Sequence, residues 1–220
     1  MPVERAFIFD LDGTLLDSLA DLAHAVNHAL AARGCPAHPE AAYKYFVGNG
    51  MRMLVRRAAP SECPDADLLN LARDVEARYA ETWHHCTRPY PGVSELLREL
   101  RRLGVPVGVL SNKPDEFTRR MVAHFFPEVD FFAVYGQRVG VPVKPDPTAA
   151  LQMVTELAST PDRVCFVGDS RVDMETAVNA GMIPVGVTWG FRPREELLEF
   201  GAKFLIDKAE DVLAVRVETE

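Results

Sequence analysis

Residues 7–18 of the chain read FIFDLDGTLLDS, an apolar run that ends in two acids, Asp10 and Asp12, followed at once by Gly13 and Thr14. The apolar run predicts a buried strand, and alternate side chains of a strand point to the same side. Asp10 and Asp12 would therefore lie close together at the end of the strand, where repulsion and burial both oppose their ionisation. The rest of the chain must supply a positive charge or a cation that offsets them.

Short apolar strands and amphipathic helices alternate after residue 91. Together with the first strand, the pattern predicts strands at residues 6–10, 105–110, 131–135, 163–168, 183–187 and 203–206. Helices are predicted between them and over the last stretch of the chain, at residues 93–103, 115–125, 147–158, 171–180 and 193–199. This alternation is typical of an α/β protein with a doubly wound parallel sheet.

The segment between the first strand and residue 86 has helical spacing and no convincing strand. Asp17 or Ser18 is expected to cap its first helix, residues 19–31. An all-helical block inside an α/β pattern indicates an inserted cap. We therefore predict two parts, an α/β core of residues 1–16 and 87–220 and a helical cap of residues 17–86.

The composition limits the classes of partner. The 220 residues include 24 Lys and Arg against 32 Asp and Glu, a net charge of −8. An acidic chain without a basic cluster is a poor candidate for binding nucleic acid or an anionic membrane. No apolar run approaches the roughly 20 residues of a membrane span. The four cysteines have no paired spacing, so we expect free thiols in a cytoplasmic protein. The expected oligomeric state is a monomer or a homodimer.

Unusual polar residues follow three of the predicted strands. The first strand ends in Asp10 and Asp12, the second in the run SNKP at 111–114, and a later one in GDSRVD at 168–173. A loop, VKPDP, adds Lys144 before a helix. Because ligands of open α/β sheets bind outside the carboxyl ends of the strands, the four segments are expected to meet at one edge. Each segment alone has a simpler explanation. The two acids with Gly13 could be a calcium loop or a surface turn, SNKP and GDSRVD could cap helices, and Lys144 could be a solvated loop residue.

Together and in this order, the four segments resemble the motifs of the haloacid dehalogenase-like hydrolase superfamily. The resemblance rests on DLDGT at 10–14, Ser111, Lys144 and GDSRVD at 168–173, and it covers nearly the whole chain. It implies a Rossmann-like core with a small inserted helical cap. The strings FDLDGTLLDS, FVGNG, SNKP, VKPDP and GDSRVD are most similar to those of phosphoglycolate phosphatases, and related phosphatases share most of them.

The acids of this edge predict a metal-assisted phosphatase site. Up to four carboxylates, those of Asp10, Asp12, Asp169 and Asp173, would need a cation, and hard oxygen ligands suit Mg²⁺. Asp10 is the expected nucleophile, which forms an aspartyl-phosphate, and Asp12 is the expected general acid and base. The resemblance implies the same two roles and adds a metal contact through the Asp12 backbone carbonyl. The expected metal ligands are therefore Asp10, Asp12 and Asp169.

The other motif residues are expected to support the site. Ser111 and the backbone of Asn112 would hold phosphoryl oxygens, helped by the start of the following helix. Lys144 would neutralise charge on the transferred group. Asp173 could contact a metal-bound water or hold Lys144, and the residues leave both roles open. Gly168, at the start of the same motif, is expected to be a supporting residue.

The stretch FVGNGMRML at 46–54 is the most unusual part of the helical insert. Gly48 and Gly50 permit a tight turn, and Arg52 follows at the start of a helix. This turn could reach over the core, where Arg52 or backbone amides would bind the far end of a substrate, such as the carboxylate of phosphoglycolate. The alternative is a helix–helix turn with a solvated arginine.

We therefore expect a Mg²⁺-dependent phosphatase for a small phosphorylated metabolite, with 2-phosphoglycolate as the leading substrate. Alternatives are a broader sugar-phosphate or nucleotide phosphatase, a pyrophosphatase, a phosphomutase and a non-catalytic phosphate-binding protein. Dehalogenases of this superfamily lack the second acid, which is present here as Asp12. A C–P hydrolase would need a Schiff-base lysine in the insert, where Lys44 has aromatic neighbours that indicate packing.

Overall fold

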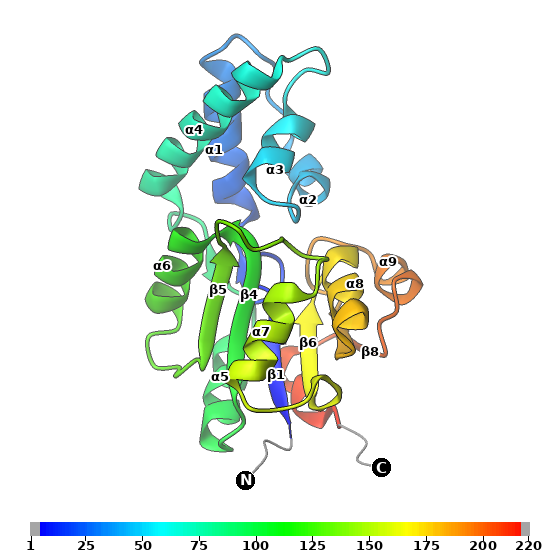
Figure 1. Ribbon diagram of the computed structural model, residues 1–220. Coiled ribbons are helices and arrows are strands. Elements are labelled where there is room, and N and C mark those ends of the chain that lie inside the picture. The colour runs from blue at the N-terminus through cyan, green and yellow to red at the C-terminus, as the bar shows by residue number, and fades with distance from the viewer. Residues whose placement is uncertain (1–4, 217–220) are drawn as a thin grey trace.

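The computed structural model describes residues 5–216, which form a six-stranded sheet with a group of helices above it (Figure 1). The strands lie in the order β5-β4-β1-β6-β7-β8, and every neighbouring pair is parallel. Their bounds are β1 Ala6–Phe9, β4 Val107–Pro114, β5 Ala133–Gln137, β6 Val164–Gly168, β7 Ile183–Val187 and β8 Phe204–Ile206. The predicted doubly wound parallel sheet is confirmed.

Alternate residues of the central strand β1 serve the two faces of the sheet. Phe7 and Phe9 belong to one apolar cluster, and Ala6 and Ile8 belong to the other. The first face is covered by α5 Val93–Arg102, α6 Asp115–Phe125 and the 3₁₀ helix η3 Ala209–Ala214. The second is covered by α7 Thr148–Glu156 and α8 Arg171–Ala180. Burial on both faces explains why these strands are continuous apolar runs in the sequence.

Four helices stand over the carboxyl ends of the strands (Figure 1). They are α1 Leu19–Ala31, α2 Tyr43–Phe46, α3 Met51–Ala58 and α4 Asp65–Thr82, with the 3₁₀ helix η1 Glu40–Ala42 between the first two. The chain leaves the sheet through β2 Leu16–Asp17 and returns through β3 Arg88–Pro89. These two strands pair antiparallel, with Leu16 opposite Pro89. The first-face apolar cluster continues from the sheet into α1 and α4.

The remaining elements refine the sequence prediction. α9 Arg194–Glu199 packs beside β7, and η2 Pro161–Arg163 precedes β6. β4 continues beyond residue 110 because, after an irregularity, Pro114 pairs with Gln137 of β5. The predicted last helix is only the short η3, and β2 and β3 are too short to leave a periodic signal. Within residues 5–216, no helix combines the length and apolar character needed to cross a membrane.

Candidate active site

The carboxyl ends of β1, β4 and β6 bring three polar side chains together. Asp10 follows β1, and its N–H donates to the carbonyl of Val167 in β6 at 2.9 Å. Ser111 lies in β4, Asp169 follows β6, and the side chains of all three polar residues are buried. Because β1 lies between the other two strands, segments that are far apart in the sequence meet at this edge. The structure thus brings the predicted motifs together.

Lys144 connects the carboxylates of this edge. Its ammonium lies 2.8 Å from Asp10 Oδ1 and 2.6 Å from Asp173 Oδ1, and its side chain is 3% exposed. Of the two roles left open for Asp173, the structure favours the pairing with Lys144. Asp173 Oδ2 also accepts hydrogen bonds from the N–H and the hydroxyl of Ser170, at 3.1 and 2.6 Å. This capping box fixes the start of α8 beside the lysine.

Asp10, Asp169 and Asp173 form a buried group of carboxylates, with one oxygen of each within 4.8 Å of the others. Burial raises the pKa of Asp10 to about 7; Lys144 opposes the rise, and the charges of Asp173 and Asp12 add to it. Burial, with repulsion from Asp173 and Asp10, also raises the pKa of Asp169 well above its ordinary value. One ammonium does not balance these charges. The carboxylate oxygens of this group are the hard ligands that Mg²⁺ prefers.

Glycines allow the backbone to approach these carboxylates closely. A Cβ atom at Gly168 would lie 2.2 Å from Cβ of Asp173, and one at Gly190 would lie 2.3 Å from Cβ of Asp169. Any side chain at either position would displace an acid of the group. Asp169 is further oriented by the N–H of Phe191, which donates to Oδ2 at 2.7 Å. Gly168, predicted as a supporting residue, therefore makes room for the last acid of its own motif.

The carboxylate of Asp12 lies outside that group. Its two oxygens accept hydrogen bonds from the ammonium of Lys113, at 3.1 and 3.0 Å. Oδ1 also accepts a hydrogen bond from the hydroxyl of Ser18 at 2.5 Å. Ser18 stands at the predicted N-cap position of α1, but its side chain makes no cap hydrogen bond because its hydroxyl donates to Asp12. Asp12 is thus held beside the candidate metal site by a cation and a hydroxyl.

Lys113 is a site residue that sequence reasoning missed. Its side chain is 5% exposed, and Nζ lies 4.6 Å from the centre of the Tyr79 ring in α4. Burial works to lower the pKa of Lys113, but Asp12 and Tyr79 outweigh it and raise that pKa above its ordinary value. A signal was present in the sequence. Ser111 and Lys113 are two residues apart, so a strand that continued through them would direct both to the same side.

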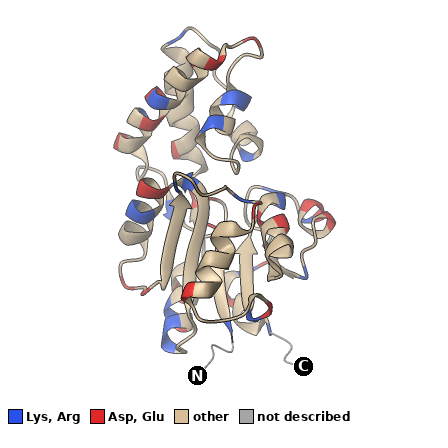
Figure 2. Cartoon of the chain, in the orientation of Figure 1, with Lys and Arg blue, Asp and Glu red and all other residues tan. Residues whose placement is uncertain are grey.

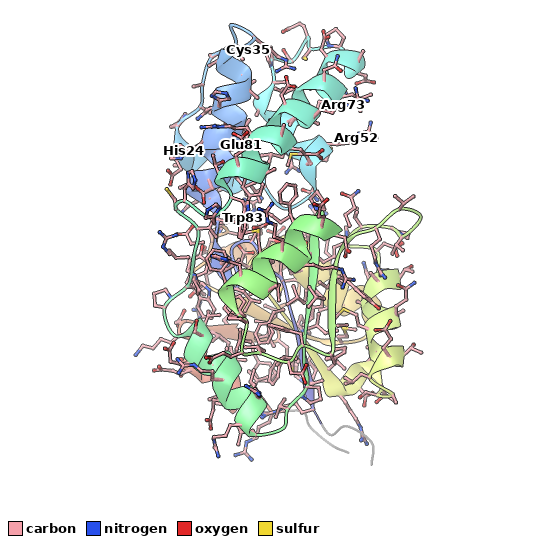
Figure 3. The ribbon with its side chains drawn as sticks, turned by 90° about the vertical axis from the view of Figure 1, so that its left-hand side faces the viewer. His24, Cys35, Arg52, Arg73, Glu81 and Trp83 are labelled. Carbon is pink, nitrogen blue, oxygen red and sulfur yellow. The ribbon has the colours of Figure 1, made fainter. Side chains whose placement is uncertain are left out.

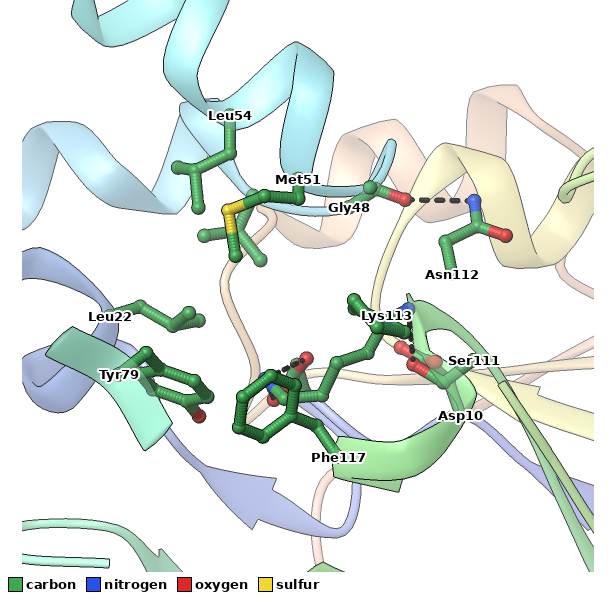
Figure 4. A pocket seen from close by; sticks show the side chains of 14 residues that line it. Asp10, Leu22, Gly48, Met51, Leu54, Tyr79, Ser111, Asn112, Lys113 and Phe117 are labelled. Atoms are coloured by element: carbon green, nitrogen blue, oxygen red, sulfur yellow. Dashed lines mark hydrogen bonds and ion pairs between the residues drawn. The ribbon is translucent and has the colours of Figure 1, made fainter. Parts of the chain in front are cut away.

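A cavity of about 50 Å³ lies between this edge and the helices above it (Figure 4). Its polar lining comes from the strand ends: Asp10, Asp12, Ser111, Asn112 and Lys113. The rest of the lining is largely apolar and comes mainly from the helices: Leu22, Val47, Gly48, Gly50, Met51, Leu54, Tyr79, Pro114 and Phe117. The cavity therefore has a charged floor and an apolar roof.

Asn112 joins the turn at residues 47–48 to the loop that carries Lys144. Its Nδ2 donates to the carbonyl of Gly48 at 3.0 Å (Figure 4). The same Nδ2 donates to the carbonyl of Lys144 at 2.9 Å. Its Oδ1 accepts a hydrogen bond from the N–H of Lys144 at 2.9 Å. The side chain of Asn112 is therefore occupied, which leaves its backbone as the part that can contact a ligand.

The arginines of the helical part take positions outside this cavity. Figure 2 shows basic residues on α2 and α3, above the sheet edge. Arg52 is exposed on α3 (Figure 3) and lines a separate pocket with Asp65, Leu68 and Gln137, so the structure does not bring it to the predicted substrate site. Arg57 donates instead to the carbonyls of Tyr45 and Phe46. From the core, Arg192 donates to the carbonyl of Val47 at 3.1 Å.

The sequence matches one family model over most of its length. The family is described as haloacid dehalogenase-like hydrolase, and the match covers residues 7–187. The chain belongs to the haloacid dehalogenase-like hydrolases. The family resemblance inferred from the motifs is confirmed, and the site described above lies within the matched segment of this hydrolase.

Individual relatives of this hydrolase extend the similarity to nearly the whole chain. A phosphoglycolate phosphatase of Pseudomonas putida is 38% identical over 85% of this chain and 70% of its own length. A phosphoglycolate phosphatase of Vibrio parahaemolyticus is 32% identical over 96% of this chain and 95% of its own. The crystal structure of a predicted phosphoglycolate phosphatase from Haemophilus somnus has a TM-score of 0.90 with 28% identity, over 97% of this chain and 98% of that chain.

Proposed function

We propose that this hydrolase is a Mg²⁺-dependent phosphatase for a small phosphomonoester, with 2-phosphoglycolate as the leading substrate. The observation that carries the proposal is the arrangement of two acids at the sheet edge. Asp10 is paired with Lys144 inside the buried carboxylate group, whereas Asp12 is held apart from that group by Lys113. The names of the relatives, phosphoglycolate phosphatases, support the choice of substrate.

Asp10 and Asp12 divide the chemistry between them. In the first step an oxygen of Asp10 attacks phosphorus, the bond from phosphorus to the leaving oxygen breaks, and Asp12 donates a proton to that oxygen. The products are an aspartyl-phosphate and the free alcohol. In the second step Asp12, now a carboxylate, takes a proton from water as the water oxygen attacks phosphorus. The bond between phosphorus and the Asp10 oxygen breaks, which restores Asp10 and releases phosphate.

Other residues hold the phosphoryl group in place. The hydroxyl of Ser111 accepts a hydrogen bond from the N–H of Lys113 at 3.3 Å, and its own proton remains available to a phosphoryl oxygen. Lys144 neutralises the transferred group, and the Asn112 backbone adjoins the same cavity. The side chains of Asp10 and Asp169, with the backbone carbonyl of Asp12, would hold Mg²⁺. The ion would supply positive charge that stabilises the phosphoryl oxygens in the transition state.

We also propose that residues 17–86 act as a cap on a core of residues 1–16 and 87–220. The hydrogen bonds from Asn112 and Arg192 to the turn at 47–48 support this division, because they join the two parts above the cavity. The cavity below that turn is small, about 50 Å³, which favours a leaving group of a few atoms.

The same proposal assigns the enzyme to the cytoplasm. Its four cysteines, Cys35, Cys63, Cys86 and Cys165, are free thiols. Thiols persist in reducing compartments, and small phosphorylated metabolites are abundant there. The proposed partner is accordingly a soluble phosphorylated metabolite.

Turnover of p-nitrophenyl phosphate with and without Mg²⁺ tests the activity. A panel of 2-phosphoglycolate, glucose 6-phosphate, AMP and pyrophosphate, compared by kcat/KM, then tests the substrate, and we expect 2-phosphoglycolate to rank first. Asp10→Asn should lower turnover at least about a thousandfold because the nucleophile is lost. Asp162→Asn, an exposed acid in η2, is the matched control. Folded wild-type protein that hydrolyses no ester would favour the non-catalytic phosphate-binding protein.

A further inference from the structure

The cavity contains one cation among the described residues that line it. That cation is Lys113, and the other charged groups of the lining are the acids Asp10 and Asp12. The walls beyond the strand ends are apolar, with Val47, Met51 and Leu54 from the cap and Phe117 from α6. An anionic group placed among such walls without a partner would lose its hydration at a high cost in free energy.

The position of Lys113 relative to the reacting atoms is set by Asp12. Asp12 must approach the leaving oxygen to about 2.6–3.2 Å to deliver a proton. Lys113 Nζ lies 3.0 Å from Asp12 Oδ2, so it lies within about 6 Å of the leaving oxygen, two hydrogen-bond lengths away. A group two carbon atoms beyond the ester oxygen can therefore contact the ammonium.

We propose that Lys113 determines specificity by binding an acidic group carried on the leaving alcohol, within about two carbon atoms of the ester oxygen. This inference rests on the proposed phosphatase function and names the substrate class of that same site, phosphoesters of short 2-hydroxy acids. The ammonium contacts both oxygens of Asp12 and the Tyr79 ring, and a substrate carboxylate would be an additional, oppositely charged partner on the side that faces the cavity. The carboxylate of the substrate then lies over the charged floor, and its carbon atoms contact the apolar roof.

The nearby arginines have other partners. Arg57 holds the carbonyls of Tyr45 and Phe46, and its Nη2 donates to Asn49 Oδ1 at 2.7 Å. Arg192 donates through Nη2 to the carbonyl of Val47 and lines another pocket, with Arg57 and Glu196. Arg52, the cation expected from the sequence to bind the far end of the substrate, is exposed and lines a different pocket. Lys113 therefore replaces Arg52 as the residue assigned to the carboxylate.

Two esters that differ in one charge test this assignment. Wild-type enzyme and Lys113→Met are compared on 2-phosphoglycolate and on ethyl phosphate, which lacks the carboxylate. Loss of the Asp12 partner affects both esters, so the ratio of their kcat/KM values isolates the carboxylate contact. We expect Lys113→Met to lower the preference for 2-phosphoglycolate about 10- to 100-fold, the value of a hydrogen bond to a charged group. The change should lie mainly in KM.

Three further variants serve as controls. Lys113→Arg keeps a cation and should retain most of the preference, which also covers the case in which Lys113→Met fails to fold. Lys44→Met removes an exposed lysine of α2 and should leave the ratio unchanged. Arg52→Met tests the competing residue directly. If Arg52→Met lowers the ratio and Lys113→Met does not, the assignment of Lys113 is overturned.

Binding measurements separate this inference from the proposed activity. Calorimetric titration of the Mg²⁺-loaded Asp10→Asn variant compares the affinities of the two esters, with and without Lys113→Met, and needs no turnover. If wild type hydrolyses both esters equally well, the inference fails although the phosphatase proposal stands. If no ester is hydrolysed, the proposed function fails and the titration alone decides. Tighter binding of 2-phosphoglycolate that Lys113→Met removes supports the inference, and equal binding of the two esters overturns it.

Discussion

Replacement of Lys144 by methionine tests how the buried acids are held. The ammonium of Lys144 is the partner of both Asp10 and Asp173, and all three residues are buried. Methionine is unbranched and apolar, so it can fill most of the space of the lysine stem. The variant therefore removes the charge and leaves Asp10, Asp169 and Asp173 facing one another.

The expected loss of stability follows from the number of charges left without a partner. Removing one partner of a buried ion pair costs about 3–5 kcal/mol, and we expect this loss for metal-free Lys144→Met at pH 8. The pKa of Asp10 is about 7 in the folded protein against an ordinary 3.8, and loss of Lys144 raises it further. Protonation of Asp10 at pH 5.5 therefore relieves part of the repulsion, so the loss should be smaller there. Mg²⁺ at pH 8 should restore part of the stability.

Urea unfolding of the metal-free and Mg²⁺-loaded protein at both pH values measures these differences. A second substitution, Asp173→Asn, removes one of the facing charges and should recover stability in the Lys144→Met background. Lys44→Met, on the exposed face of α2, should change the free energy of unfolding by less than about 0.5 kcal/mol. A loss below about 1 kcal/mol at pH 8 would contradict the reasoning. So would a further loss in the double variant.

Two other predictions concern the metal and the segment at which the helical insert rejoins the sheet. Because the pKa values of Asp10 and Asp169 are raised, protons stabilise the metal-free fold and its stability falls as pH rises from 4 to 7. Mg²⁺ should therefore raise Tm more at pH 8 than at 5.5, and equal shifts would refute this. Asp21→Ala should cost about 3 kcal/mol in urea unfolding, because Asp21 accepts hydrogen bonds from Cys86 N–H and the N–H and hydroxyl of Thr87. Thr87→Val should cost less, since it removes only one of these bonds.

The sheet and the meeting of the motifs could be predicted from the sequence because both leave local signals. The buried strands are unbroken apolar runs, and Asp10, Ser111 and Asp169 follow or extend them at the carboxyl ends. The order of strands in such a sheet then brings these residues to one edge without any knowledge of individual contacts.

The partner of Asp12 could not be found in the same way. The position of Lys113 depends on β4 running past residue 110, and that depends on the pairing of Pro114 with Gln137, more than 20 residues away. The direction of a single side chain at an irregular strand end is a tertiary property.

Two arginines of α3, Arg52 and Arg57, differ in how far the sequence predicts their positions. The buried positions Met51, Leu54, Val55 and Ala58 form one face of α3, and this spacing leaves Arg52 on the polar side. This spacing is visible in the sequence and favours the alternative in which Arg52 is solvated. The hydrogen bonds of Arg57 to the carbonyls of Tyr45 and Phe46 depend on how α3 folds back on α2, which no periodicity encodes.

The pairing of β2 with β3 has a consequence for how the helical insert could be replaced. The two ends of the helical insert lie side by side, Leu16 opposite Pro89, at the ordinary separation of neighbouring strands, about 4.8 Å. A different insert, or a tight two-residue link, can join these ends without shifting any strand of the large sheet. On the proposed division into core and cap, such an exchange would replace the roof of the cavity, and the new segment would also have to supply a partner for Asp12 in place of Ser18.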